Sequence, residues 1–159
     1  MDSLVNSVIA LMPIHPEFTA SIFLGRKHVE FRKIAFSKKP DAILVYSTRP
    51  TSKVVGLFFV NELDVDSPES LWNKYGSIGG IDIDRFLDYY SQSNLGLAIT
   101  IRKTIEFGSP MTLREFGIEN YTPQNYIYIK YKILQDNLNP FLLNDIETTL
   151  YKHHSRTGS

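Results

Sequence analysis

Residues 25–33, with the sequence Gly-Arg-Lys-His-Val-Glu-Phe-Arg-Lys, decide how the rest of this chain is interpreted. Within this stretch, the apolar residues Val29 and Phe31 alternate with polar residues. Side chains of a β-strand point alternately to its two faces, so the pattern predicts a strand whose apolar face meets a core. Glu30 and Arg32 then share the opposite face. There, an acid and a base two residues apart can bond to each other or share a ligand.

A short helix is predicted immediately before this strand, over residues 16–24. Pro16 suits the first turn of a helix, where its missing N–H costs nothing. Phe18 and Ile22 fall one turn apart on one side of this helix. Gly25 follows at the position where a helix C-terminus favours a left-handed residue. The helix therefore delivers the chain directly into the strand.

Further apolar runs have the length and composition of strands. They cover residues 7–12, 41–48, 53–65 and 95–107. Pro13 is expected to end the first run. The run over residues 41–48 is apolar on both parities up to Tyr46, which is typical of a central strand covered on both faces. Gly56 interrupts the next run and predicts a β-bulge or a bend.

Helices are predicted between and after these strands. Ser67 and Pro68 form a cap and a first turn for a helix that reaches residue 75. Asp82 caps a second helix, whose apolar face is formed by Ile83, Phe86, Leu87 and Tyr90. Residues 112–116 form a helical turn, residues 124–134 fit either a strand or a helix, and residues 144–150 form a terminal helix.

This order of elements indicates an α+β fold. Strands dominate, several contain glycine, and short helices are inserted between them. We therefore expect a small, strongly bent sheet or β-barrel with short helices packed at its openings. The sequence shows no repeat, linker or low-complexity segment, so a single domain is expected over residues 1–150. Residues 151–159 are expected to form a solvated C-terminal tail.

Composition excludes several classes of protein. The chain has 159 residues, 43% of them hydrophobic, and a formal net charge of zero, so it carries no global attraction to nucleic acid. It lacks cysteine, which excludes disulfides and Cys-ligated zinc. Its four histidines lack the spacing of metal ligands, so neither a metal nor a cofactor is expected. No secretory signal or membrane span is recognisable, which predicts a cytoplasmic protein without a membrane partner.

A local basic cluster lies within this neutral chain. A phosphate-bearing ligand is one natural partner of such a cluster, and a solvated basic hairpin is the alternative. The residues of the cluster are Arg26, Lys27, Arg32, Lys33, Lys38 and Lys39.

The pattern Gly25-x-Lys27-x-x-Glu30-x-Arg32, preceded by a helix, resembles the ASCH domain of the PUA-like superfamily. A strand end of matching type follows at residues 46–50, Tyr-Ser-Thr-Arg-Pro. The resemblance covers about residues 7–130. It implies a PUA-like bent β-barrel with a cleft across its mouth, RNA or nucleotide binding, and a role in transcriptional or translational regulation. Relatives in the wider superfamily read modified bases in a pocket.

Some small bacterial ASCH proteins resemble amidohydrolases that deacylate modified cytidine with a lysine, a threonine and a glutamate. Lys27 matches the lysine of that set. Glu30, however, stands where those enzymes carry the threonine, so an activatable hydroxyl is replaced by a negative charge. A few ASCH proteins are described as ribonucleases, which leaves an acid–base role open for Lys27 and Glu30. Thr48 is a further candidate for a catalytic hydroxyl.

The sequence thus leads to a site hypothesis with three alternatives. The first is a module that binds RNA, single-stranded nucleic acid or a nucleotide. The second is a nucleoside amidohydrolase or ribonuclease that uses Lys27 and Glu30, and the third is a protein-interaction module. Tyr89 is included in the ligand site because its neighbour Tyr90 fits the apolar face of the helix better. The expected ligand-binding residues are Lys27, Glu30, Arg32, Ser47, Thr48, Arg49 and Tyr89.

Overall fold

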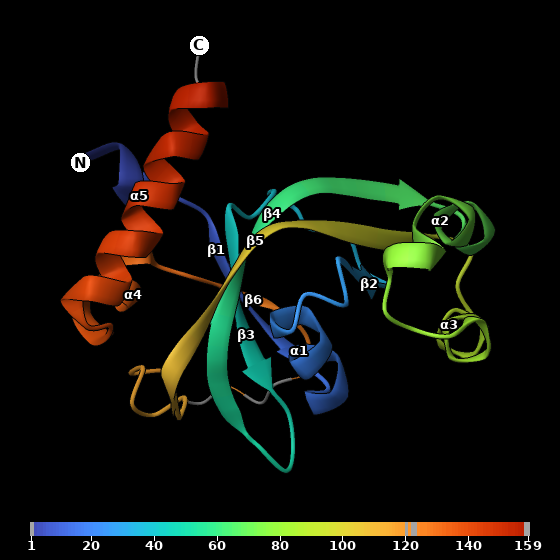
Figure 1. The fold of residues 1–159 in the computed structure, drawn as a ribbon, viewed down its shortest axis with the longest axis horizontal. Helices are drawn as coiled ribbons and strands as arrows, with labels where there is room; N and C mark the ends of the chain where they lie inside the picture. The colour runs from blue at the N-terminus through green and yellow to red at the C-terminus, as the bar shows by residue number, and fades with distance from the viewer. Residues whose placement is uncertain (1, 120, 122–123, 158–159) are drawn as a thin grey trace.

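A computed structural model describes residues 2–119, 121 and 124–157 of the chain. This part forms an α+β fold with a six-stranded mixed sheet and five α-helices (Figure 1). The strands are β1 (Ile9–Ile14), β2 (Val29–Arg32), β3 (Ala42–Ser47), β4 (Lys53–Asp66), β5 (Gly96–Met111) and β6 (Ile127–Ile129). The helices are α1 (Pro16–Phe23), α2 (Pro68–Tyr75), α3 (Ile83–Tyr89), α4 (Tyr131–Asn137) and α5 (Pro140–Thr157). Two short 3-10 helices, η1 (Asp2–Asn6) and η2 (Gly76–Ile78), complete the described elements.

The strands pair in the order β2-β5-β4-β3-β1-β6. β1 and β3 run parallel, and the other neighbouring pairs run antiparallel. β2 and β6 are therefore the two edges of the sheet. In the described part of the chain no ladder joins these edges, so the barrel closure expected from the sequence is not found.

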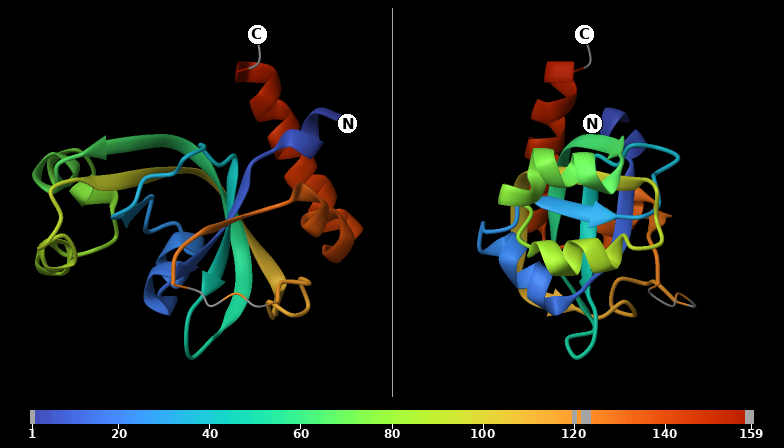
Figure 2. Two further views of the ribbon diagram at one scale, coloured as in Figure 1. Left: turned by 180° about the vertical axis from the view of Figure 1, so that it is seen from behind. Right: turned by 90° about the vertical axis from the view of Figure 1, so that its right-hand side faces the viewer.

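The sheet bends strongly along its two longest strands, β4 and β5. β4 has 14 residues and β5 has 16, and both run from the central sheet to the end that carries α2 and α3 (Figures 1 and 2). Their pairing shifts register at three points, the first between Val54 and Gly56. A Cβ at Gly56 would lie 2.5 Å from the carbonyl oxygen of Ile105. The shift of register confirms the predicted irregularity at Gly56. A glycine is required there because a side chain would keep the two backbones apart.

Both faces of the central sheet are covered. Every residue of β3 is buried, as its two-sided apolar pattern predicts. Alternate residues of the strand belong to different clusters: Leu44 packs in the core under α4 and α5, whereas Ile43 and Val45 pack in the core near α1. A third cluster fills the space between β2, β5, α2 and α3, with Phe31 and Phe86 in contact. The third cluster sets the position of α3 over the edge strand β2.

Several predicted boundaries differ from the structure. Pro13 lies inside β1, where it pairs with Tyr46, because the chain is still extended on the far side of the proline. Residues 124–134 contain both expected elements, β6 followed by the start of α4. In α3, Ile83 and Leu87 are 46% and 52% exposed, so the buried face is narrower than the pattern predicted.

The C-terminal helix is longer than the sequence indicated. α5 runs from Pro140 to Thr157, so residues 151–157 continue a helix instead of forming the expected solvated tail. His154 of this last part pairs with Asp41 at the start of β3, with 3.4 Å between Nε2 and Oδ1. That contact ties the end of the helix to the central sheet.

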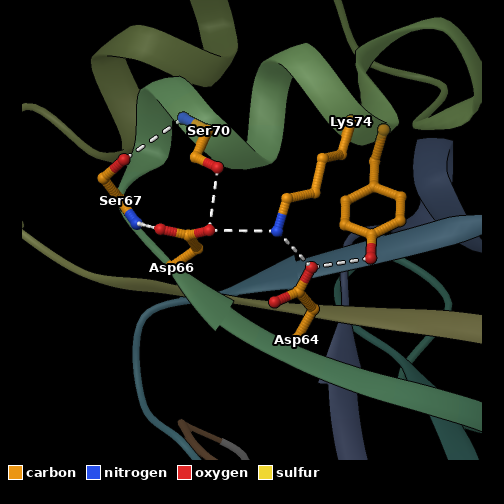
Figure 3. A network of polar contacts seen from close by, with 6 residues as sticks. Asp64, Asp66, Ser67, Ser70 and Lys74 are labelled. Atoms are coloured by element: carbon orange, nitrogen blue, oxygen red, sulfur yellow. Dashed lines mark hydrogen bonds and ion pairs between the residues drawn. The ribbon is translucent and has the colours of Figure 1, made fainter.

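A polar network fastens α2 to the end of β4 (Figure 3). The Lys74 ammonium lies 2.9 Å from the carboxylate of Asp64 and 3.0 Å from that of Asp66. Asp66 also accepts from the Ser70 hydroxyl, and the Ser67 side chain caps the helix by accepting from the Ser70 N–H. The predicted cap at Ser67 is therefore confirmed, and the helix has a fixed place at this end of the molecule.

Candidate functional site

The stretch that opens β2 is held in place by the end of α1. Gly25 adopts a φ of 75°, as its position after a helix predicted. The next two backbone N–H groups, of Arg26 and Lys27, both donate to the carbonyl of Ser21. This turn places the side chain of Lys27 beside the strand before the alternation of β2 begins.

A cavity of about 330 Å³ lies at this point, between α1, β2, α3 and the segment that follows η2. Its charged lining residues are Lys27, Glu30, Arg32, Arg85 and Asp88, and its aromatic ones are Phe18, Phe31, Phe86 and Tyr89. His15 and Ile81 complete the lining. We refer to this cavity as the Glu30 pocket. It combines flat apolar walls with a buried carboxylate, an arrangement suited to a planar polar ligand.

Lys27 is a buried cation beside the Glu30 pocket, with a side chain only 2% exposed. Its Nζ donates to the carbonyl of Gly79 and lies 3.7 Å from Oε1 of Glu30. The same ammonium lies 4.8 Å from the ring centre of Phe18 and 5.4 Å from that of Phe31. Burial lowers the pKa of Lys27, and attraction to Glu30 opposes that shift only in part.

Glu30 occupies the centre of the charged group. Its side chain is 6% exposed and stands between two cations, Lys27 on Oε1 and Arg32 on Oε2. The separations of 3.7 Å and 3.4 Å are longer than a good charge-assisted hydrogen bond. A carboxylate has about four acceptor positions, so Glu30 retains capacity for a donor from a ligand.

Arg32 extends from the buried carboxylate toward solvent. Its Nη1 donates to the carbonyl of Pro13 at 3.1 Å and to Glu30 at 3.4 Å. Within the described residues its other N–H groups have no hydrogen-bond partner, and its side chain is 19% exposed. The Tyr90 hydroxyl fixes the backbone by donating to the Arg32 carbonyl at 2.8 Å. Arg32 is therefore an anchored guanidinium with donors still available.

The structure brings together four of the seven residues expected to bind a ligand. Lys27, Glu30, Arg32 and Tyr89 all line the Glu30 pocket, and burial raises the pKa of the Tyr89 hydroxyl. The other three expected residues lie at the end of β3 and in the turn after it, and they do not line this cavity. Ser47 is buried with its hydroxyl 3.2 Å from that of Thr19, Thr48 is half-buried in the following turn, and Arg49 is exposed.

Sequence reasoning missed the residues that α1 and α3 bring to the pocket. Arg85 and Asp88 lie one turn apart on the face of α3 that also carries Tyr89. The Arg85 guanidinium lies 4.7 Å from the ring centre of Phe18 and bonds to Glu17 at 2.8 Å. The helical spacing of residues 85, 88 and 89 was the available signal, because it puts all three on one side of the helix.

The basic cluster of the sequence is dispersed in the structure. Lys27 is buried, whereas Lys33 lies over the ring of Tyr89 with 4.5 Å between Nζ and the ring centre. Lys39 donates to the backbone carbonyl of Asn61 on β4. Of the cluster, Lys27 and Arg32 line the Glu30 pocket.

The described residues match neither the pattern of a metal site nor that of a membrane-spanning helix. They contain no group of three or more His, Cys, Asp or Glu side chains arranged to hold a metal ion. Among them, no helix combines the length and the apolar character needed to cross a membrane.

The sequence is similar to several curated proteins, although no protein-family model matches it. An ASCH domain-containing ribonuclease of Zymomonas mobilis is 29% identical over 94 residues, which cover 58% of this chain and 64% of the ribonuclease. ATP synthase subunit alpha of Ureaplasma parvum is 30% identical over 133 residues, covering 81% of this chain. That match covers only 16% of the subunit. With 64% of the ribonuclease covered, the chain spans less than two thirds of the length of each of these two relatives.

The fold is also similar to a solved structure. A crystal structure of a Ser→Ala variant of the Zymomonas mobilis ASCH protein superposes with a TM-score of 0.74 and 25% sequence identity. The superposition covers 80% of this chain and 92% of the other. Shared fold, sequence similarity and the predicted motif around Glu30 agree: this chain has the fold of the ASCH domain, as the resemblance predicted.

Proposed function

We propose that this chain binds RNA or a nucleotide, with one base held in the Glu30 pocket. The observation that carries the proposal is the buried Glu30 carboxylate at the floor of an aromatic-walled cavity, flanked by Lys27 and Arg32. Similarity to a protein named as an ASCH domain-containing ribonuclease supports an RNA-related function. The bent, PUA-like sheet supplies the frame, and a regulatory role through RNA binding is part of the proposal.

The chemistry of the pocket matches a nucleobase. Glu30 accepts a hydrogen bond from an exocyclic amino group of the base. Phe18 and Tyr89 provide aromatic surface for the flat ring. Arg32 donates to a phosphate or to a carbonyl oxygen of the base. Lys27 holds the carboxylate in place from below, and a modified base is accommodated where the modification leaves the amino hydrogen in place.

Glu30→Gln provides the sharpest test of base recognition. The amide keeps the size of the side chain but replaces an acceptor oxygen by a donor, which faces the amino group of the base. We expect RNA binding, measured by fluorescence anisotropy with a labelled single-stranded RNA, to weaken about tenfold to a hundredfold. Lys132→Ala is the matched control, because Lys132 is exposed on α4. Equal binding by wild type and Glu30→Gln would refute this base-recognition proposal.

A second candidate function is hydrolysis of RNA or of an acylated nucleoside. The burial of Lys27 with its Nζ 3.7 Å from Glu30 favours it, because burial lowers the pKa of the lysine and so increases the fraction of unprotonated amine that can accept a proton. Thr48 and Arg49 lie outside the pocket lining, so the candidate acid–base pair is Lys27 with Glu30.

Mass spectrometry distinguishes the two functions. Single-stranded RNA and a panel of modified nucleosides are incubated with the wild type and with Lys27→Met. Product formed by the wild type and lost in Lys27→Met indicates an enzyme, whereas saturable binding without product indicates a reader. Neither binding nor product would leave the third alternative, a protein-interaction module.

A further inference from the structure

A second cavity lies directly beside the Glu30 pocket and shares part of its wall. It has a volume of about 300 Å³ and is lined in part by Arg32, Lys33, Tyr89 and Tyr126. Arg32 and Tyr89 line both cavities, so they form the partition between them. We refer to this second cavity as the Lys33 pocket. A ligand that fills both cavities therefore lies against Arg32 and Tyr89.

The two cavities differ in charge. The Glu30 pocket is lined by charges of both signs, the carboxylates of Glu30 and Asp88 together with the cations Lys27, Arg32 and Arg85. Among the described residues that line the Lys33 pocket, the charged ones are Arg32 and Lys33, and both are cations. Lys33 is exposed, and its ammonium lies 4.5 Å from the ring centre of Tyr89. An anionic group is therefore favoured at the partition and in the Lys33 pocket, and not at the carboxylates of the Glu30 pocket.

The Lys33 pocket also contains a fixed aromatic ring. Tyr126 packs against Phe36 with 4.4 Å between the ring centres, and against Tyr128 of β6 at 5.4 Å. Tyr126 is half-buried, so part of its surface is open to the cavity. A ring that its neighbours already hold loses little conformational entropy when a base stacks on it.

We propose that the Lys33 pocket binds the nucleotide adjacent to the one in the Glu30 pocket, with Arg32 contacting the phosphodiester between them. This inference rests on the proposed function. It specifies the ligand as a single-stranded oligonucleotide of two or more nucleotides instead of a free nucleoside. Lys33 binds the next phosphate, and Tyr126 provides the stacking surface for the second base.

The test compares binding of a short and a long ligand. Isothermal titration calorimetry is performed with the four ribonucleoside 5′-monophosphates and with a random-sequence single-stranded hexaribonucleotide. We expect the wild type to bind the hexamer at least about tenfold more tightly than any monophosphate. Lys33→Ala and Tyr126→Ala each reduce that advantage, because they lower the affinity for the hexamer more than the affinity for the monophosphates. Lys132→Ala and Tyr151→Ala, at exposed residues of α4 and α5, are the matched controls.

Salt dependence provides a second measurement. If Lys33 contacts one phosphate, Lys33→Ala reduces the slope of log affinity against log salt for the hexamer by about 0.7. An unchanged slope, or a hexamer that binds no more tightly than a monophosphate, overturns the second subsite. If monophosphates still bind and Glu30→Gln still weakens them, the proposed function survives that result. If neither ligand binds to the wild type, both proposals are refuted.

Discussion

Lys27 is a buried, titratable residue, so its effect on the stability of the fold depends on pH. Burial lowers its pKa in the folded protein below the ordinary 10.5. Below the lowered pKa the lysine is charged in both states, and the burial of its charge costs stability. Between the lowered pKa and 10.5 the unfolded chain binds more protons than the folded one, so stability rises with pH.

The prediction is that wild type gains stability relative to Lys27→Met as pH increases through this alkaline window. The gain approaches at most about 1.4 kcal/mol per pH unit, the value for one proton. Urea unfolding of both proteins between about pH 7 and pH 10.5 measures it. Parallel stability curves for the two proteins would contradict the lowered pKa of Lys27.

Gly80 is a second residue on which the Glu30 pocket depends. Its φ of +63° is unfavourable for other residues, and a Cβ there would lie 2.7 Å from Cβ of Lys27. Gly25 has a φ of +75° but an added Cβ would have no neighbour within 4 Å. An alanine at Gly25 would therefore add backbone strain alone, whereas an alanine at Gly80 would add the same strain and a steric clash with Lys27.

We expect Gly25→Ala to lower the free energy of unfolding by about 1 kcal/mol. Gly80→Ala is expected to cost about 2–4 kcal/mol, because overpacking adds to the same backbone strain. It also weakens RNA binding by displacing Lys27. Thermal unfolding and anisotropy measure the two effects, and equal behaviour of the two variants would show that the contact with Lys27 is easily relieved.

At the scale of elements, the network in Figure 3 fastens α2 to β4 and is sensitive to acid. Hydrogen bonds from Lys74, Ser70 and the Ser67 backbone lower the pKa of Asp66 from 3.8 to about 2. A lowered carboxyl pKa stabilises the folded state above the unfolded value of 3.8. That stabilisation is lost as pH falls through about 2.

Lys74→Ala removes the largest cause of this shift. We expect the wild type to be more stable than the variant near pH 6, and the difference to shrink as pH falls from about 4 to about 2. Circular dichroism followed during thermal unfolding at several pH values measures the difference. Lys152→Ala, an exposed lysine on α5, is the control and should show no such convergence. A difference that is constant with pH would rule out the network as its source.

At the scale of the whole molecule, Asp41 joins the sheet to the C-terminal helix. Its Oδ2 accepts from the Val8 N–H at 2.8 Å, and its Oδ1 pairs with His154 of α5 at 3.4 Å. Its backbone carbonyl accepts from Val60 of β4. One residue therefore connects the chain entering β1 with β4 and α5, which follow much later.

Asp41→Ala should destabilise the protein by about 1–3 kcal/mol, because it leaves the Val8 N–H without its acceptor. His154→Ala should cost less than about 1 kcal/mol, since the pair it breaks is partly solvated. Urea unfolding of both variants provides the comparison. Equal losses would mean that the contact with α5, and not the bond to Val8, carries the effect.

The sequence by itself determined most elements of the fold. Local chemistry placed Gly25 at a helix end, Ser67 at a helix start and Gly56 at an irregularity, and all three are confirmed. Apolar patterning identified β3 as a strand covered on both faces. These features were predictable because their causes lie within a few residues along the chain.

Only the tertiary structure decided which side chains meet and whether the sheet closes. Periodicity placed Glu30 and Arg32 on one face, but no local pattern places Gly79 against Lys27, or α3 over the edge strand. Those contacts depend on how the long strands β4 and β5 bend, which sets distances between residues far apart in sequence. Tertiary packing therefore decides which residues line the pocket, whereas the local sequence already predicts the strand that supplies its carboxylate.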